Sequence, residues 1–143
     1  MYQKILVPTD FSEPSEGVWQ HAAELAKLCG AKLVALYVVE PVLSHYGMVG
    51  LIPSVTELEE QHDIASQVKL KELADKAKSE GLNVETRVLK GKPWRAIVEA
   101  VADTGADLVV MGTHGRTGIS HEALGSTAER VVQRAACPVL VVR

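Results

Sequence analysis

The chain has 143 residues, and its 15 Lys and Arg and 18 Asp and Glu residues give a formal net charge of −3. A chain of this length can bury the core of one domain, and no linker, internal repeat or low-complexity segment divides residues 1–143. Because the charges are interspersed, they argue against a nucleic-acid-binding surface and provide no basic patch for a membrane. The N-terminus lacks a signal sequence and no apolar run approaches the roughly 20 residues that span a bilayer, so we expect a cytoplasmic protein without membrane insertion.

The first half of the chain alternates strand and helix patterns. Residues 5–7 form the apolar centre of a short strand, and a polar turn, PTDFS at residues 8–12, follows it. Pro14 favours the first turn of the next helix, because a proline there lacks only an N–H that has no helical partner. Residues 33–39 are apolar throughout, as expected of a central strand. The long apolar connection that follows, up to Pro53, is equally compatible with packing, a lid or an interface.

The second half continues the alternation. Residues 56–80 predict a charged helix whose two halves have apolar residues in different phases, which indicates a bend or a second contact surface. Residues 84–89 alternate in the manner of an edge strand with one wetter face. After a helix that begins near Pro93, residues 108–111 form a buried strand, and a final helix leads to a fifth strand at residues 139–142.

Five strands that alternate with four helices predict a single α/β domain with a doubly wound parallel sheet and helices on both faces. In such sheets ligands bind beyond the carboxyl ends of the strands, where the strand order reverses. The order itself does not follow from these patterns.

A glycine-containing segment follows the strand at residues 108–111. Gly112, Gly115 and Gly125 allow backbone N–H groups to approach a phosphate chain, and the N-terminus of the next helix adds unpaired donors. The spacing is not that of a P-loop, because no lysine follows Gly125, nor is it GxGxxG. An alternative interpretation is a capping box, in which the Ser126 hydroxyl and the Glu129 carboxylate close the start of the helix.

The spacing from Gly112 to Gly115 to the Gly125-Ser126 pair resembles the signature of the ATP-binding branch of the universal stress protein family. The similarity includes PTDFS at residues 8–12 and CPVLVV at residues 137–142, and it covers essentially the whole chain. The resemblance implies a Rossmann-like sheet of order 3-2-1-4-5. That order would place the end of the first strand opposite the glycine segment.

The resemblance also implies a set of base-binding residues. Adenine would meet the backbone of Thr9 and Val39, with Pro8 and Met111 as apolar walls. Asp10 would bind the ribose hydroxyls or hold a phosphate-bound Mg²⁺ through water. The alternative for Asp10 is a turn aspartate that accepts hydrogen bonds from the next backbone N–H groups.

The phosphates would be bound by backbone N–H groups, the Ser126 hydroxyl and the Arg116 guanidinium. One departure from the family pattern is Ala128, where a hydroxyl is expected, and it leaves the preference among ATP, ADP and AMP open. The nucleotide-binding residues on this side of the crevice are Gly112, Gly115, Arg116, Thr117, Gly125, Ser126 and Thr127.

Three functions are compatible with these residues. The resemblance implies a dimeric regulatory module of the stress response that signals by nucleotide occupancy. A slow ATPase or phosphotransferase is the second, although no residue to position an attacking water is apparent, so we expect no enzyme beyond slow ATP turnover. The third is a nucleotide-free interaction module with a protein partner. We expect homodimerisation through an apolar edge strand comprising Val139, Leu140, Val141 and Val142.

Overall fold

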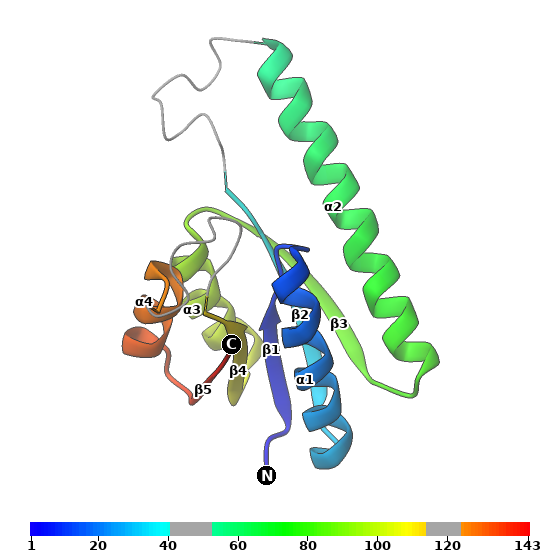
Figure 1. Cartoon of the computed structure of the whole chain (residues 1–143), viewed down its shortest axis with the longest axis vertical. Coiled ribbons are helices and arrows are strands. Elements are labelled where there is room, and N and C mark those ends of the chain that lie inside the picture. Colours follow the sequence, from blue (N-terminus) through cyan, green and yellow to red (C-terminus); the bar gives the residue numbers. More distant parts are fainter. Residues whose placement is uncertain (41–52, 114–123) are drawn as a thin grey trace.

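The structure is a computed structural model that describes residues 1–40, 53–113 and 124–143 (Figure 1). Its centre is a five-stranded sheet in which every pairing is parallel and the order is β3-β2-β1-β4-β5. The predicted doubly wound α/β fold and its strand order are therefore confirmed. The elements are β1 (Lys4–Pro8), α1 (Glu13–Cys29), β2 (Lys32–Val39), α2 (Pro53–Ser79), β3 (Val84–Lys90), α3 (Pro93–Thr104), β4 (Leu108–Gly112), α4 (Ser126–Arg134) and β5 (Val139–Val142).

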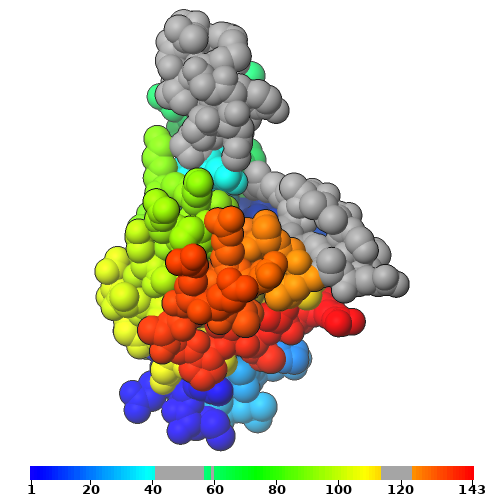
Figure 2. Space-filling view, turned by 90° about the vertical axis from the view of Figure 1, so that its left-hand side faces the viewer, coloured from blue at the N-terminus to red at the C-terminus, as the bar shows by residue number. Residues whose placement is uncertain are grey.

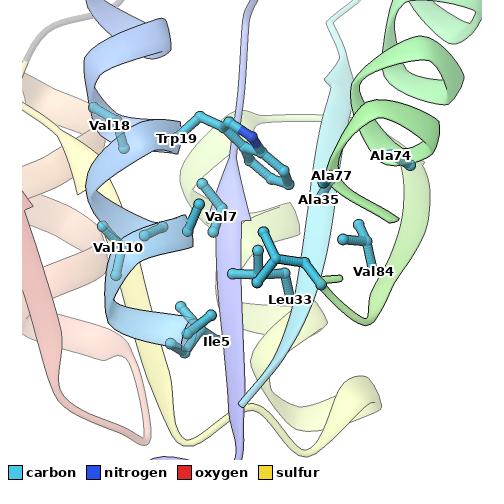
Figure 3. Packing of buried hydrophobic residues seen from close by; sticks show 14 of the residues in the cluster. Ile5, Val7, Val18, Trp19, Leu33, Ala35, Ala74, Ala77, Val84 and Val110 are labelled. Carbon is cyan, nitrogen blue, oxygen red and sulfur yellow. The ribbon is translucent and has the colours of Figure 1, made fainter. Parts of the chain in front are cut away.

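The sheet separates the core into two apolar layers. Successive side chains of a strand point to opposite faces, so Ile5 and Val7 pack under α1 and α2, whereas Leu6 packs under α3 and α4. Trp19 of α1 packs in the first layer, and Figure 3 shows it above Val7. Helices thus cover both faces, and the sheet can present ligands only at its ends.

Helices α1 and α3 end where glycine follows them. Gly30 has a φ of 67° and Gly105 a φ of 73°, a left-handed conformation that costs a glycine little. Pro14 lies in the first turn of α1, as predicted from its missing N–H. Local backbone geometry at these residues therefore accounts for the boundaries of the two helices.

Helix α2 differs from expectation in one respect. It is one helix of 27 residues, and Figure 1 shows no bend in it. Its second half packs on the sheet through Leu70 and Ala74, each 2% exposed, while Leu58 and Ile64 in the first half are 63% and 62% exposed. The change of apolar phase therefore reflects a first half that extends beyond the sheet and leaves apolar side chains exposed.

At the amino ends of the strands, Asp107 fastens β1 beside β4. Its Oδ2 accepts a hydrogen bond from the Gln3 N–H at 2.8 Å, and its Oδ1 accepts one from the Lys4 N–H at 3.0 Å. Burial acts to raise the pKa of Asp107, but these N–H donors outweigh it and the pKa lies below its usual value. This clamp holds the two central strands in register at the end opposite the candidate site.

Candidate functional site

The strand order reverses between β1 and β4. From β1 the chain builds outward through β2 and β3 on one side, and β4 and β5 lie on the other. Leu6 pairs with Val109, and the same register carried forward places Thr9 near Gly112. The polar turn after β1 and Gly112 at the end of β4 therefore meet at one edge, as the strand order implied.

The turn after β1 is held by its own side chains. The Asp10 Oδ1 accepts hydrogen bonds from the Ser12 N–H at 2.9 Å and from the Ser12 hydroxyl at 2.5 Å. The Thr9 hydroxyl donates to the Ser15 Oγ at 3.3 Å, and the Ser15 hydroxyl donates to the Ser12 carbonyl at 2.7 Å. Asp10 thus has the turn-forming role that was one of its two interpretations, and Ser12 and Ser15 join it in a network that sequence analysis did not identify.

Phe11 has an unusual backbone conformation within this turn. Its φ of 60° is in the left-handed region, which is uncommon for an aromatic residue. The Phe11 N–H donates to the Thr9 Oγ1 at 3.2 Å, and its ring lies 5.7 Å from the ring of Tyr37. These contacts hold a conformation that costs about 1–2 kcal/mol, and such strain is concentrated at functional sites.

Two of the backbone groups near the expected base site already take part in hydrogen bonds at the sheet. The Thr9 N–H donates to the Leu36 carbonyl at 2.8 Å, and the Val39 carbonyl accepts from the Gly91 N–H at 2.9 Å. A base contact at the Thr9 backbone therefore has to use its carbonyl. Met111 is 5% exposed and belongs to the core beneath α3 and α4, whereas Pro8 and Val39 are half-buried and can contribute an apolar surface.

The glycine segment is closed at its two ends. The Gly125 N–H donates to the Thr113 carbonyl at 2.9 Å, and the Thr113 N–H donates to the Val142 carbonyl of β5 at 3.2 Å. This geometry commits the Gly125 N–H, which was expected to contact phosphate, to closing the segment. Three of the expected phosphate-binding residues, Gly115, Arg116 and Thr117, lie outside the described residues.

The start of α4 shows that the capping-box alternative is wrong. The N-cap is Gly125 and not Ser126, and no side chain makes a capping hydrogen bond. The Glu129 N–H donates to the Gly125 carbonyl at 2.9 Å, which is the first bond of the helix itself. Helix geometry therefore leaves the N–H groups of Ser126, Thr127 and Ala128 without an intrahelical acceptor.

The side chains of this first helical turn point in different directions. Ser126 is exposed and Thr127 is half-buried, whereas Ala128 is 2% exposed and packs in the core. A side chain at position 128 faces the core, so the hydroxyl missing from Ala128 would not have faced a ligand at the helix end. The departure at Ala128 leaves the backbone donors of the turn in place.

Two further features describe the surroundings of the site. Within residues 1–40, 53–113 and 124–143, no group of three His, Cys, Asp or Glu side chains gathers as a metal site. A Mg²⁺ at Asp10 would therefore need oxygen ligands from a bound phosphate or from water.

No helix of the described chain combines the length and the apolar composition needed to cross a membrane.

Comparisons with known proteins agree with this architecture. The model of the Universal stress protein family matches residues 1–143. Universal stress protein MJ0531 of Methanocaldococcus jannaschii is 40% identical over 145 residues, which cover 100% of this chain and 83% of that protein. The structure of the universal stress protein UspA from Lactobacillus plantarum has a TM-score of 0.87 at 29% identity and covers 99% of this chain and 98% of its own. A universal stress protein in complex with cAMP has a TM-score of 0.71 at 29% identity, with 99% and 97% covered.

Proposed function

This chain belongs to the universal stress protein family, and on that premise we propose that it binds an adenine nucleotide at the carboxyl ends of β1 and β4. The observation that carries the proposal is the meeting of two segments there. The Thr9–Ser15 turn and the start of α4, where three N–H groups have no intrahelical acceptor, lie at the edge where the strand order reverses. A relative of similar fold that was solved with cAMP supports a nucleotide as the ligand.

The phosphates would lie at the start of α4. Unpaired N–H groups at a helix N-terminus and the positive end of its dipole stabilise anions there. The exposed Ser126 hydroxyl is not used for capping, so it can donate to a phosphate oxygen. Gly115, Arg116 and Thr117 complete this proposed phosphate site by their place in the sequence.

The base and ribose would lie on the β1 side. Pro8 and Val39 provide half-buried apolar surface for adenine. The Thr9 carbonyl can accept a hydrogen bond from the amino group of the adenine. Asp10 would bind the ribose or support Mg²⁺ on the phosphates while its Oδ1 maintains the turn. We take ATP as the ligand implied by the family signature, with ADP and AMP as alternatives.

The function would be regulatory. Binding at this edge would couple nucleotide occupancy to the glycine segment, whose end at Thr113 is bonded to β5, and β5 lies at an edge of the sheet. A homodimer formed through Val139, Leu140, Val141 and Val142 would then place each nucleotide site next to the subunit interface. Nucleotide occupancy could thereby control a regulated protein partner in the stress response.

The first experiment is to identify the nucleotide. Freshly purified protein is denatured, the released small molecules are separated by chromatography, and the stripped protein is titrated calorimetrically with Mg-ATP and Mg-AMP. We expect about one released nucleotide per chain and rebinding with a micromolar dissociation constant. Release of no nucleotide together with no heat of binding would refute the proposal and favour the nucleotide-free interaction module.

A substitution at Asp10 tests how the nucleotide is held. Asp10→Asn keeps a carbonyl oxygen that can accept the hydrogen bonds of Ser12, so the turn should persist while the charge is lost. We expect ATP affinity to fall about tenfold in Mg²⁺ and much less in EDTA, because the carboxylate would act through the metal. Glu13→Gln removes an exposed acid at the start of α1 and should leave both affinities unchanged. Equal ATP affinities for the Asp10→Asn variant and the unsubstituted chain, in both buffers, would exclude a role for this carboxylate.

A further inference from the structure

Three arginines surround one tryptophan between α3 and α4. The guanidinium carbons of Arg95, Arg130 and Arg134 lie 5.3, 5.4 and 5.1 Å from the ring centroid of Trp94. Trp94 and Arg95 are in the first turn of α3, and the other two are one turn apart on α4. These helices lie side by side on the face seen in Figure 2, with α4 in orange, so the four residues form one local arginine cluster.

The arginines of the cluster have no ion-pair partner among the described residues. Arg87 on β3, by contrast, pairs with Glu85 at 3.0 Å. A tryptophan face attracts a cation, but significant cation–π contacts occur about once in 70–80 residues, and here three cations share one ring. Like charges held this close repel one another, so the arrangement favours an anion from outside the chain.

The Trp94 indole provides a second, independent observation. Its Nε1 is buried and has no hydrogen-bond partner among the described residues. A buried N–H without an acceptor is costly, and nearly all such groups are satisfied in folded proteins. Among the described residues, the arginines thus lack an ion-pair partner and the indole N–H lacks an acceptor.

We propose that this arginine cluster binds a small anion that carries several phosphate groups. A guanidinium presents a planar fork of donors that matches a phosphate in two-point contacts. All three arginines lie around a single ring, so the complementary ligand concentrates its charge in a small volume. Linked phosphate groups place several negative charges in a small volume, whereas each carboxylate side chain of a protein partner carries only one.

The size of the ligand follows from the charge of the chain. The net charge of −3 would repel a long polyanion over most of the surface, so a compact anion fits better than nucleic acid. The cluster consists of Trp94, Arg95, Arg130 and Arg134, and none of these four residues is among those proposed to bind the nucleotide. The proposal therefore does not depend on nucleotide binding at β1 and β4.

The test uses the fluorescence of Trp94. The chain has two tryptophans, so a Trp19→Phe variant reports on Trp94 alone, and it is titrated with sodium tripolyphosphate against sodium sulfate at equal ionic strength. We expect a saturable change with tripolyphosphate, not with sulfate, and a midpoint that saturating AMP leaves unchanged. If Trp19→Phe does not fold, calorimetry on the unsubstituted chain measures the same binding.

Two matched substitutions decide whether the cluster is the site. Arg134→Gln should weaken tripolyphosphate binding about tenfold, as the loss of one charge-assisted contact implies. Arg87→Gln removes an exposed arginine of another element and should leave binding unchanged. No saturation, equal effects of the two variants, or displacement by AMP would overturn the proposal. Failure of the nucleotide proposal would leave the tripolyphosphate titration as it is, so the two results are distinguishable.

Discussion

Ser126 shows how the role of one residue depends on where a helix begins. Its position before Thr127, Ala128 and Glu129 fits a capping box, and the same position fits a phosphate contact. Because the helix starts one residue earlier, with Gly125 as its cap, Ser126 lies inside the first turn with an exposed hydroxyl. The residue is therefore available for a ligand and is not needed for the helix.

This assignment makes a prediction about Ser126→Ala. The free energy of unfolding should change by less than about 0.5 kcal/mol, as for an exposed side chain without a capping bond. Nucleotide affinity should fall about tenfold through one lost hydrogen bond. Urea unfolding and calorimetry measure the two quantities. Ser79→Ala, whose hydroxyl bonds the Lys76 carbonyl at the end of α2, is the control and should leave affinity unchanged. A loss above about 1 kcal/mol in Ser126→Ala would restore the capping role.

Asp107 makes a pH-dependent prediction. Because folding lowers the pKa of Asp107, its contribution to stability is present above the unfolded pKa of about 3.9 and is lost as the pH falls through the lower folded pKa. Asp107→Asn should therefore lower the free energy of unfolding by about 1 kcal/mol at neutral pH. The difference from the unsubstituted chain should shrink in strong acid.

Urea unfolding at pH 7 and in strong acid checks this prediction. Asp103→Asn, an exposed acid at the end of α3, is the matched control and should show no such dependence. If the effect of Asp107→Asn were the same at both pH values, hydrogen bonds to the charged carboxylate would not be its cause.

At the scale of the element, β5 shows how an edge strand can present backbone groups for pairing. The carbonyls of Pro138 and Val142 accept hydrogen bonds from β4, so the alternate residues Val139 and Val141 direct their backbone groups to the free edge. Val139 and Val141 are half-buried, as are their strand neighbours. An apolar edge strand with outward backbone donors is suited to pairing with a second copy of the chain.

Val141→Pro tests this pairing. Proline removes one outward N–H and leaves the hydrogen bonds to β4 intact, so we expect a folded monomer in place of a dimer. Light scattering during size-exclusion chromatography measures the mass, and circular dichroism checks the fold. Val141→Thr keeps the N–H and a similar shape, and it should remain dimeric. A Val141→Pro chain that stays dimeric would place the interface elsewhere.

Helix α2 also shows how packing determines the phase of the apolar residues in an element. The phase change between Ile64 and Leu70 predicted a bend or a second contact surface, and the continuous helix excludes only the bend. A helix packed along its whole length must keep its apolar residues in one phase. The first half of α2 projects beyond the sheet (Figure 1) and is not held to that phase.

At the scale of the whole molecule, the proposed site requires two distant segments to meet. Residues 9–15 and residues 112–113 are about a hundred positions apart, yet parallel pairing of β1 with β4 brings them to one edge. The amino ends of the same two strands are held by Asp107. The proposed nucleotide site therefore depends on the register of the whole sheet, and not on either segment alone.

The sequence by itself determined the kind and position of each element. Apolar runs such as residues 33–39 and 108–111 predict buried strands, and Pro14, Gly30 and Gly105 act through local backbone geometry. These effects depend on neighbours within a few positions, so they can be read along the chain. The family resemblance added the strand order, which local patterns do not encode.

Only the tertiary structure decided which groups are used and which are left over. The Gly125 N–H bonds the Thr113 carbonyl, the Thr9 N–H bonds the Leu36 carbonyl, and Met111 is buried. Trp94 and Arg134 meet because α3 packs against α4. Hydrogen bonding and burial depend on partners far away in sequence, and no local pattern records which partner a group will find.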